Sequence, residues 1–331
     1  MRLLPLLFAA CTVIASVAPM RAADSELLVA SYDVAREVYK DLNAAFVAEH
    51  PGLVIQMSHG GSSKQARAVI DGLNADAVAM NQSLDVDQIA KAGLLPKDWA
   101  TRKPLNSSPS WSVIQFLVRP GNPKGIKDWG DLVKPGIAVI LPNPKTSGNG
   151  RYSYLAAWGW AMRQPGGSPA SAEQFVGQLF AQVPVLDAGG RGATTTFAQR
   201  EIGDVLLTFE NELHLIRKEL ADQKYEVVVP SVSIRADNPV SVVDRTAAKK
   251  GNADLANAYI DFHFTAQAQE IFAKNGLRPA DPAILAKHAA EFPDSTLVSV
   301  ELNFAGWANA QATHFADGGI YDRIVKANAK K

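Results

Sequence analysis

The chain is short of the residues that several classes of protein require. Its 331 residues include one cysteine, which excludes a disulfide scaffold and any zinc site built on several cysteines. Basic and acidic residues number 33 each, and this neutral balance gives no basic surface of the kind that binds nucleic acid. A hydrophobic content of 47% argues against intrinsic disorder, and the length is typical of two domains.

The first residues are the only stretch apolar enough to suggest a membrane or an export signal. Arg2 is followed by an apolar run over 3–17, and small residues around Ala22 offer a cleavage point. Together these features predict a cleaved signal peptide over 1–22, because the run is short for a membrane-spanning helix. We therefore expect export to the periplasm, where a mature chain that has lost Cys11 needs no oxidative folding.

Short β-rich runs alternate with helical stretches through the rest of the chain. Between residues 27 and 80 the order is strand, helix, strand, helix, strand, and Val34, Val38, Leu42 and Phe46 give the first helix an apolar stripe. This alternation predicts an α/β fold around a mostly parallel sheet. Strands are expected at 27–30, 53–57, 76–80, 112–118, 136–141, 183–186, 205–209, 227–230 and 240–243, and helices over 34–46, 66–73, 149–163 and much of the chain after 253.

Two extended segments, near 110–118 and 227–235, are candidate crossings between two α/β lobes. A polar, proline-containing joint precedes the first of them. We therefore expect one lobe to comprise residues 23–110 plus 232–331, and the other to comprise 111–231.

Three places share one design, in which a strand end leads through a short polar or glycine-rich turn into the first turn of a helix. They lie at 31–33, 58–63 and 144–150. The first turn of a helix leaves backbone N–H groups without intrahelical partners and carries the positive end of the helix dipole. Such a turn can bind an anion. Taken one at a time, each turn is also explained by ordinary helix N-capping.

A fourth glycine-rich turn, at 188–192, leads into another expected helix. Open α/β sheets bind their ligands where the strands end, so several such turns could converge on one site. This convergence favours an anion-binding function over capping alone.

Several longer strings resemble the periplasmic sulfate-binding proteins of ABC importers, and the similarity extends over essentially the whole mature chain. The strings that carry it are YDVARE at 32–37, SHGGSSKQA at 58–66, PNPKTSG at 142–148, YLAAWG at 154–159, GDVL at 203–206, ENE at 210–212, FAGW at 304–307 and HFADGG at 314–319.

The resemblance implies a two-lobed periplasmic binding protein of type II, with a mixed sheet flanked by helices in each lobe. In that family the lobes close around one dehydrated oxyanion, which neutral donors hold, mainly backbone N–H groups at helix starts. A membrane permease then receives the anion. The resemblance implies no catalysis, no cofactor and no obligate oligomer, so we expect a monomer, and the six histidines show no metal-ligand spacing.

The resemblance also implies the residues that bind the ligand. The Asp33 carboxylate would turn to a capping role, and Asn149 stands where relatives commonly have glycine. Backbone N–H groups would come from Asp33, Gly148, Asn149 and Gly190, and hydroxyl groups from Ser62 and Ser147.

Phe209 departs from the family pattern, because relatives have a tryptophan just before the Glu-Asn-Glu run whose indole N–H donates to the anion. Phenylalanine has no donor. One lost hydrogen bond to a charged partner costs about 1.5–3 kcal/mol, which predicts sulfate binding weaker by roughly ten- to a hundredfold unless water or another donor fills the gap. The alternative is a ligand with one fewer acceptor oxygen, such as thiosulfate.

Other ligands and another function class stay open as alternatives. Phosphate retains a proton at neutral pH, which a cleft lined only by donors would leave without an acceptor, and molybdate or tungstate would fit a similar site. An exported hydrolase could use Ser147 or Ser62 as its nucleophile. Neither serine lies in a Gly-x-Ser-x-Gly string, which disfavours this alternative.

Two pairs of charged residues lie near the expected site. Arg151 and Arg191 follow two of the anion turns and either polarise the donating peptides or lie in solvent. Glu210 and Glu212 are expected to pair with nearby basic groups rather than to act as a catalytic acid and base.

Overall fold

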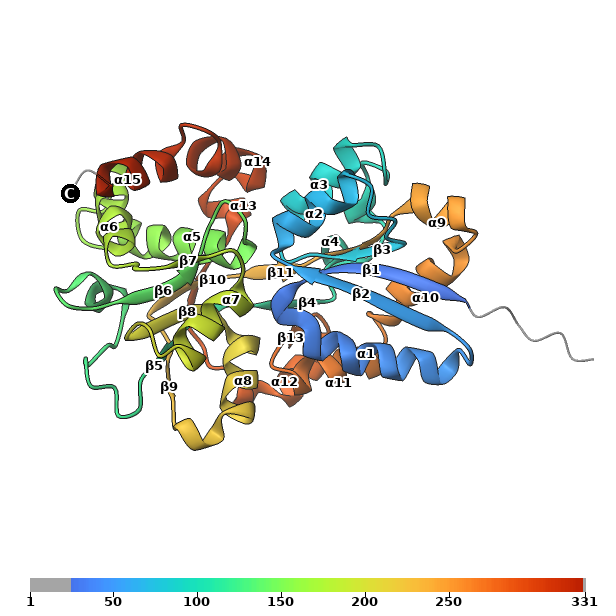
Figure 1. Cartoon of the computed structure of the whole chain (residues 1–331), viewed down its shortest axis with the longest axis horizontal. Helices are drawn as coiled ribbons and strands as arrows, with labels where there is room; N and C mark the ends of the chain where they lie inside the picture. Colours follow the sequence, from blue (N-terminus) through green and yellow to red (C-terminus); the bar gives the residue numbers. More distant parts are fainter. Residues whose placement is uncertain (1–24, 330–331) are drawn as a thin grey trace, which may run out of the picture.

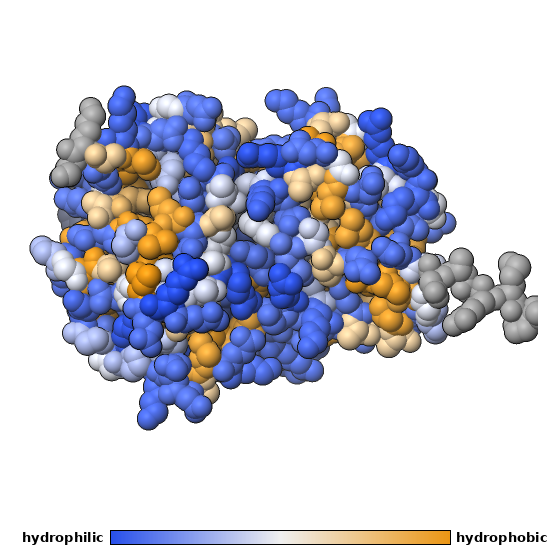
Figure 2. Space-filling view, in the orientation of Figure 1, coloured by the Kyte–Doolittle hydropathy of each residue, from blue (hydrophilic) through white to orange (hydrophobic). Residues whose placement is uncertain are grey.

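A computed structural model describes residues 25–329, so the predicted signal peptide over 1–22 lies outside the described residues. Two α/β lobes lie side by side along the long axis of the molecule, each built on its own sheet (Figure 1). Figure 2 shows a largely hydrophilic surface where the two lobes meet on this face, with apolar residues gathered on either side. Within residues 25–329, none of the helices has the length and apolar character needed to cross a membrane.

The first lobe contains a four-stranded sheet in the order β12-β3-β1-β2, in which only β12 is antiparallel to its neighbour. The predicted stripe of Val38, Leu42 and Phe46 is buried against this sheet, which explains why the helix forms here. The strands are β1 (Glu26–Tyr32), β2 (Val54–Gly60), β3 (Ala77–Ala79) and β12 (Val240–Val242), and the helices are α1 (Arg36–Glu49), α2 (Ser62–Ile70), α3 (Ser83–Lys91), α9 (Asp244–Lys250), α10 (Ala253–Phe262), α11 (Ala266–Lys274) and α12 (Pro282–Lys287).

The second lobe contains a five-stranded mixed sheet in the order β7-β6-β8-β5-β9. Its central helix α5 is buried on nearly every side, so it has no separate polar face and its polar residues are buried with the apolar ones. The predicted strand at 183–186 is mostly absent, because Pro184 has no N–H for a ladder and pairing begins only at Leu186. The strands are β5 (Ile114–Val118), β6 (Val139–Pro142), β7 (Leu186–Asp187), β8 (Val205–Phe209) and β9 (Glu226–Val228), and the helices are α5 (Gly148–Met162), α6 (Pro169–Ala181), α7 (Gly190–Thr194) and α8 (Glu210–Glu219).

A small sheet between the lobes contains the start of the predicted crossing at 110–118, and the predicted crossing at 227–235 leads into it at Ala236. Its order is β11-β4-β13, and the chain leaves it at Val113 to enter the second lobe. The crossing at 227–235 includes β10, which pairs with β14 against the second lobe, and at β14 the chain crosses a third time. The strands are β4 (Ser110–Ser112), β10 (Val232–Ile234), β11 (Ala236–Asn238), β13 (Arg278–Pro279) and β14 (Thr296–Val298), and α4 (Pro104–Ser107) precedes β4.

The C-terminal helices contradict the expectation that 232–331 returns entirely to the first lobe. Helices α13 (Val300–Asn303), α14 (Gly306–Ala310) and α15 (Ile320–Asn328) lie beside the second lobe (Figure 1). Arg323 of α15 pairs with Glu173 of α6 at 2.8 Å. The physical reason is that α15 buries an apolar face on α5 and α6, which would otherwise be exposed. The other lobe boundaries stay a prediction.

The C-terminal segment also supports one of the predicted anion turns. Lys145 Nζ lies 2.9 Å from the Phe315 carbonyl oxygen and 2.8 Å from Asp322 Oδ1. The turn at 144–150 is therefore held from outside by residues that follow it by more than 160 positions.

Gly167, between α5 and α6, tests how tightly these two helices join. A Cβ at this position would overlap the Met162 carbonyl oxygen, so we expect Gly167→Ala to lower the free energy of unfolding by about 1–3 kcal/mol. Gly177→Ala is the matched control, because its Cβ would meet no atom within 4 Å inside α6, and it should raise stability by about 0.5–1 kcal/mol. Urea unfolding measures the free energy of unfolding of both variants. Equal values for Gly167→Ala and Gly177→Ala would contradict the described turn at Gly167.

Candidate functional site

The turns that follow the strands of both lobes meet at one junction. Gly61, before α2, approaches the second lobe so closely that a Cβ there would lie 2.6 Å from the Thr146 carbonyl oxygen. A Cβ on Gly148 would overlap Oδ1 of Asn81, which comes from the first lobe. Glycine is needed at both positions because a side chain there would overlap the other lobe, at its backbone for Gly61 and at the buried Asn81 side chain for Gly148.

The predicted residues lie together at this junction. Asn81 contacts Gly148 and donates its backbone N–H to the Ser62 hydroxyl over 3.3 Å. Gly190 lies between Val34 and the amide of Asn149. Helices α2, α5 and α7 therefore begin within one region, as does the short 3-10 helix Asp33–Ala35.

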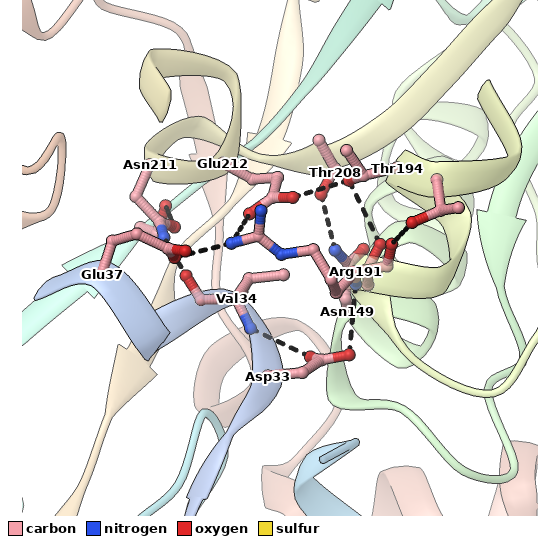
Figure 3. Close-up of polar contacts among 12 residues, drawn as sticks. Asp33, Val34, Glu37, Asn149, Arg191, Thr194, Thr208, Asn211 and Glu212 are labelled. Atoms are coloured by element: carbon pink, nitrogen blue, oxygen red, sulfur yellow. Dashed lines mark hydrogen bonds and ion pairs between the residues drawn. The ribbon is translucent and has the colours of Figure 1, made fainter. Parts of the chain in front are cut away.

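The Asp33 carboxylate joins the two lobes through backbone N–H groups. Oδ1 accepts from Val34 N at 3.1 Å, and Oδ2 accepts from Arg191 N at 3.1 Å, in the first turn of α7 (Figure 3). Burial raises the pKa of this carboxyl group, while the backbone N–H groups act in the opposite direction. The carboxylate thus caps a helix of the opposite lobe and leaves its own backbone N–H to other partners.

Ser62 differs from the expectation that its hydroxyl faces a ligand. This residue is 0% exposed, and its hydroxyl donates to Asp85 Oδ2 at 2.5 Å. The physical reason is that Asp85 is fully buried and gathers the available donors, including Gln82 Nε2 at 2.7 Å. The other neighbours of the hydroxyl are the Met80 sulfur and the Asn81 backbone N–H, so within residues 25–329 this serine lacks the histidine partner that a hydrolase nucleophile requires.

Ser147 occupies the N-cap position of α5 and is 2% exposed, but its side chain makes no capping hydrogen bond in the described chain. Its hydroxyl and the first N–H groups of α5 therefore stay available at the junction.

Phe209 ends β8 and is buried. Its ring lies edge-on to Tyr152 of α5, with centroids 5.9 Å apart, and Tyr152 in turn lies edge-on to Trp307. These aromatic rings pack behind the start of α5 and add no N–H donor at position 209.

The Arg191 side chain links two glutamates across the junction. Its Nη2 lies 2.7 Å from Glu37 Oε2 in the first lobe and 3.6 Å from Glu212 Oε2 in the second (Figure 3). Glu212 is buried and accepts from the Thr194 hydroxyl at 2.7 Å. The ion pair between Arg191 and Glu37 joins the lobes in the arrangement seen here.

The other charged residues are also engaged by the protein. Arg151 is 5% exposed, so the alternative that it lies in solvent is wrong, and its Nε donates to the Pro144 carbonyl oxygen at 2.9 Å. Glu210 pairs with Arg278 at 2.6 Å, which together with the Arg191 contact confirms that the two glutamates pair with basic groups. Within residues 25–329, no three or more His, Cys, Asp or Glu side chains are placed to hold a metal ion.

The sequence interpretation missed Asn81, Asp85 and the Asn149–Thr208 hydrogen bond. Asn81 had a usable signal, because it follows β3 and precedes α3 in the same strand, turn and helix order as the recognised turns. Asp85 had no such signal, since its position inside α3 does not reveal that it faces Ser62.

Glu212 provides a test of this charge arrangement. Burial raises its pKa to about 7, despite the opposing effects of Arg191 and Thr194. Between the unfolded pKa of about 4.3 and the folded value, the folded state binds the extra proton, so this stability contribution is complete below pH 4 and is lost as the pH rises through 7. The contribution of Glu212 to wild-type stability should therefore fall from pH 5 to pH 8, whereas the buried His263 and His314, whose pKa values burial lowers to about 4, contribute in the opposite direction.

We expect Glu212→Gln to reduce that fall by on the order of 2 kcal/mol, because the amide stays neutral throughout. Glu173→Gln, which removes a partly exposed carboxylate from the same lobe, is the control and should keep the wild-type profile. Urea unfolding at pH 5, 6, 7 and 8 measures the effect, and parallel curves for wild type and Glu212→Gln would contradict the assignment.

Comparisons with known proteins agree with this geometry. A family model described as "Bacterial extracellular solute-binding protein" matches residues 27–278. The thiosulfate-binding protein of Pseudomonas aeruginosa is 54% identical over 308 residues, covering 91% of this chain and 92% of the relative. The sulfate-binding protein of Escherichia coli is 48% identical over 310 residues, covering 92% and 94%.

A solved structure confirms the expected periplasmic binding protein fold, with mixed sheets flanked by helices. The sulfate-binding protein SubI from Mycobacterium tuberculosis superimposes with a TM-score of 0.81 at 34% identity, and the match covers 88% of this chain and 99% of that one. The chain belongs to the sulfate- and thiosulfate-binding family of bacterial extracellular solute-binding proteins, which bind solutes and are not enzymes.

Proposed function

We propose that this chain is the extracytoplasmic receptor of an ABC importer and that it captures sulfate or thiosulfate between its lobes. The observation that carries the proposal is the convergence of three helix starts and a 3-10 turn from both lobes on one junction. The ligand-binding residues of the proposal are Asp33, Ser62, Ser147, Gly148, Asn149 and Gly190, with Phe209 in the wall.

Uncharged donors suit a small dianion in this position. Each helix start offers backbone N–H groups and the positive end of a helix dipole without a mobile countercharge. Arg191 pairs with Glu37, and Arg151 Nε donates to a carbonyl oxygen, while Nη1 of Arg151 has no hydrogen-bond partner within residues 25–329. The anion would therefore exchange its hydration shell for fixed dipoles, which are already oriented before it arrives.

Ser62 would then act mainly through its backbone N–H, since its hydroxyl donates to Asp85. Ser147 keeps its hydroxyl free of the helix cap and is the stronger candidate for a side-chain donor.

Binding would couple to lobe closure. An anion that accepts from α2 of the first lobe and from α5 and α7 of the second stabilises the arrangement in which these helix starts are adjacent. The Asp33 bond to Arg191 N and the Glu37 ion pair reinforce the same arrangement. A membrane permease of the importer would recognise the closed pair of lobes.

Sulfate and thiosulfate are both supported by the relatives, whose names include each ligand at similar identity. Sulfate is the first candidate, and the presence of Phe209 makes thiosulfate the second. The terminal sulfur of thiosulfate is a weaker hydrogen-bond acceptor than oxygen and can lie against an aromatic ring, where an oxygen would lose a donor. Phosphate is the ligand that a donor-lined site disfavours most, because its proton needs an acceptor.

The proposed location is the periplasm, with the predicted signal peptide over 1–22 removed. The extracellular class of the matching family supports export. The mature chain would act as a monomer with a membrane permease as its partner and without a cofactor.

Phe209→Trp tests the ligand directly. The indole N–H would add one donor, so we expect sulfate to bind about ten- to a hundredfold more tightly to this variant, with little gain for thiosulfate. Calorimetric titration of the mature chain with sulfate, thiosulfate, phosphate and molybdate provides the measurement.

Phe175→Trp is the control, because this residue lies on α6 against Trp160, in the outer part of the second lobe. It should change none of the affinities. If the wild-type protein binds none of the four anions, the proposed function fails; an unchanged sulfate affinity in Phe209→Trp means that ring 209 does not face the ligand.

A further inference from the structure

The side chain of Asn149 lies inside the cluster of helix starts, although sequence considerations assign it only a backbone role. Asn149 is the second residue of α5 and is 1% exposed. Its Nδ2 donates to the Thr208 hydroxyl at 2.8 Å (Figure 3), and its Oδ1 accepts from the Ser153 hydroxyl at 3.3 Å. The amide is therefore held in one place by two neighbours and does not sample the surface.

The same amide touches the start of α7. A Cβ built on Gly190 would lie 3.1 Å from Asn149 Nδ2, so the nitrogen packs directly against this glycine. Thr208, which accepts from the amide, immediately precedes Phe209 at the end of β8. Asn149 thus brings a polar nitrogen to the place where α5, α7 and β8 meet.

An amide nitrogen carries two hydrogens, and this one has an uncommitted donor. Within residues 25–329, one hydrogen bond engages Nδ2, the bond to Thr208. A buried N–H without a partner is costly, so the second hydrogen is expected to have an acceptor in the functional state. The acceptor must be small and must reach the start of α7.

We propose that the Asn149 side-chain amide donates its second N–H to the bound oxyanion and is a specificity-determining group of the cleft. It supplies a neutral side-chain donor at the strand end where Phe209 supplies none. The inference rests on the proposed function, and it adds a side-chain contact to the backbone contact assigned to this residue. A ligand oxygen next to Asn149 gains a hydrogen-bond donor, while the part of the cleft lined by the Phe209 ring stays apolar.

The rival explanation is that Asn149 only ties α5 to β8. Thr208→Val removes the tie with little change of shape and leaves the amide in place, whereas Asn149→Ala removes both the tie and the donor. A purely structural role therefore predicts equal losses of binding in the two variants. The proposal predicts that Asn149→Ala loses much more than Thr208→Val.

The experiment titrates wild type, Asn149→Ala, Thr208→Val, Phe209→Trp and the Asn149→Ala/Phe209→Trp double variant with sulfate and thiosulfate by calorimetry. We expect Asn149→Ala to weaken sulfate binding about ten- to a hundredfold, the effect of one charge-assisted hydrogen bond, with its ligand-free melting temperature close to that of Thr208→Val. Phe209→Trp should improve sulfate binding more in the Asn149→Ala background than in wild type, because the indole N–H replaces the missing donor.

Sulfate and thiosulfate affinities of Asn149→Ala within threefold of wild type would overturn the proposal, as would equal losses in Asn149→Ala and Thr208→Val. An improvement by Phe209→Trp that is the same factor in both backgrounds would also overturn it. Titration of the wild type distinguishes failure of the proposed function from failure of the Asn149 proposal. A wild-type chain that binds neither anion refutes the proposed function itself. Saturable wild-type binding with an unaffected Asn149→Ala refutes only the role of the amide.

Discussion

The close approach of the two lobes at two glycines is the constraint on which the rest of this structure depends. The Thr146 backbone lies against Gly61, and the Asn81 side chain lies against Gly148, so a side chain at either glycine would overlap atoms of the other lobe. This proximity allows N–H groups from helices of separate lobes to face a common point. A site made of peptide groups needs such closeness, because a single dipole is weak and its effect decays within a few ångströms.

The carboxylates near that point and Arg191 are compensated by neighbouring groups of the protein. Arg191 faces Glu37 and Glu212, while Asp85 collects the hydroxyl of Ser62 and the amide of Gln82. Burial raises the pKa of both Asp85 and Glu212. Arg151 is buried near the start of α5 and makes no ion pair within residues 25–329, so this guanidinium and the oriented backbone dipoles both contribute to the field at the junction.

The sequence was sufficient for features that local patterns determine. The alternation over 27–80 and the turns after β1, β2 and β6 follow from apolar periodicity and from glycine and serine placement, and the structure contains them. Features set by tertiary packing could not be predicted in this way. The direction of the Ser62 hydroxyl depends on a buried carboxylate 23 positions later, and the return of α15 to the second lobe depends on which apolar surface it covers.

The contacts of Lys145 with the C-terminal segment connect the end of the chain to the site, although the two lie far apart in the sequence. The lysine is held by the carbonyl oxygen of Phe315 and by Asp322, close to the last described residue. A purification tag or fusion partner attached after α15 would lie next to a segment that restrains an anion turn, whereas the first described strand, β1, begins in the first lobe on the far side of the molecule (Figure 1). Immobilisation of this protein for sensing or capture should therefore use the amino-terminal end.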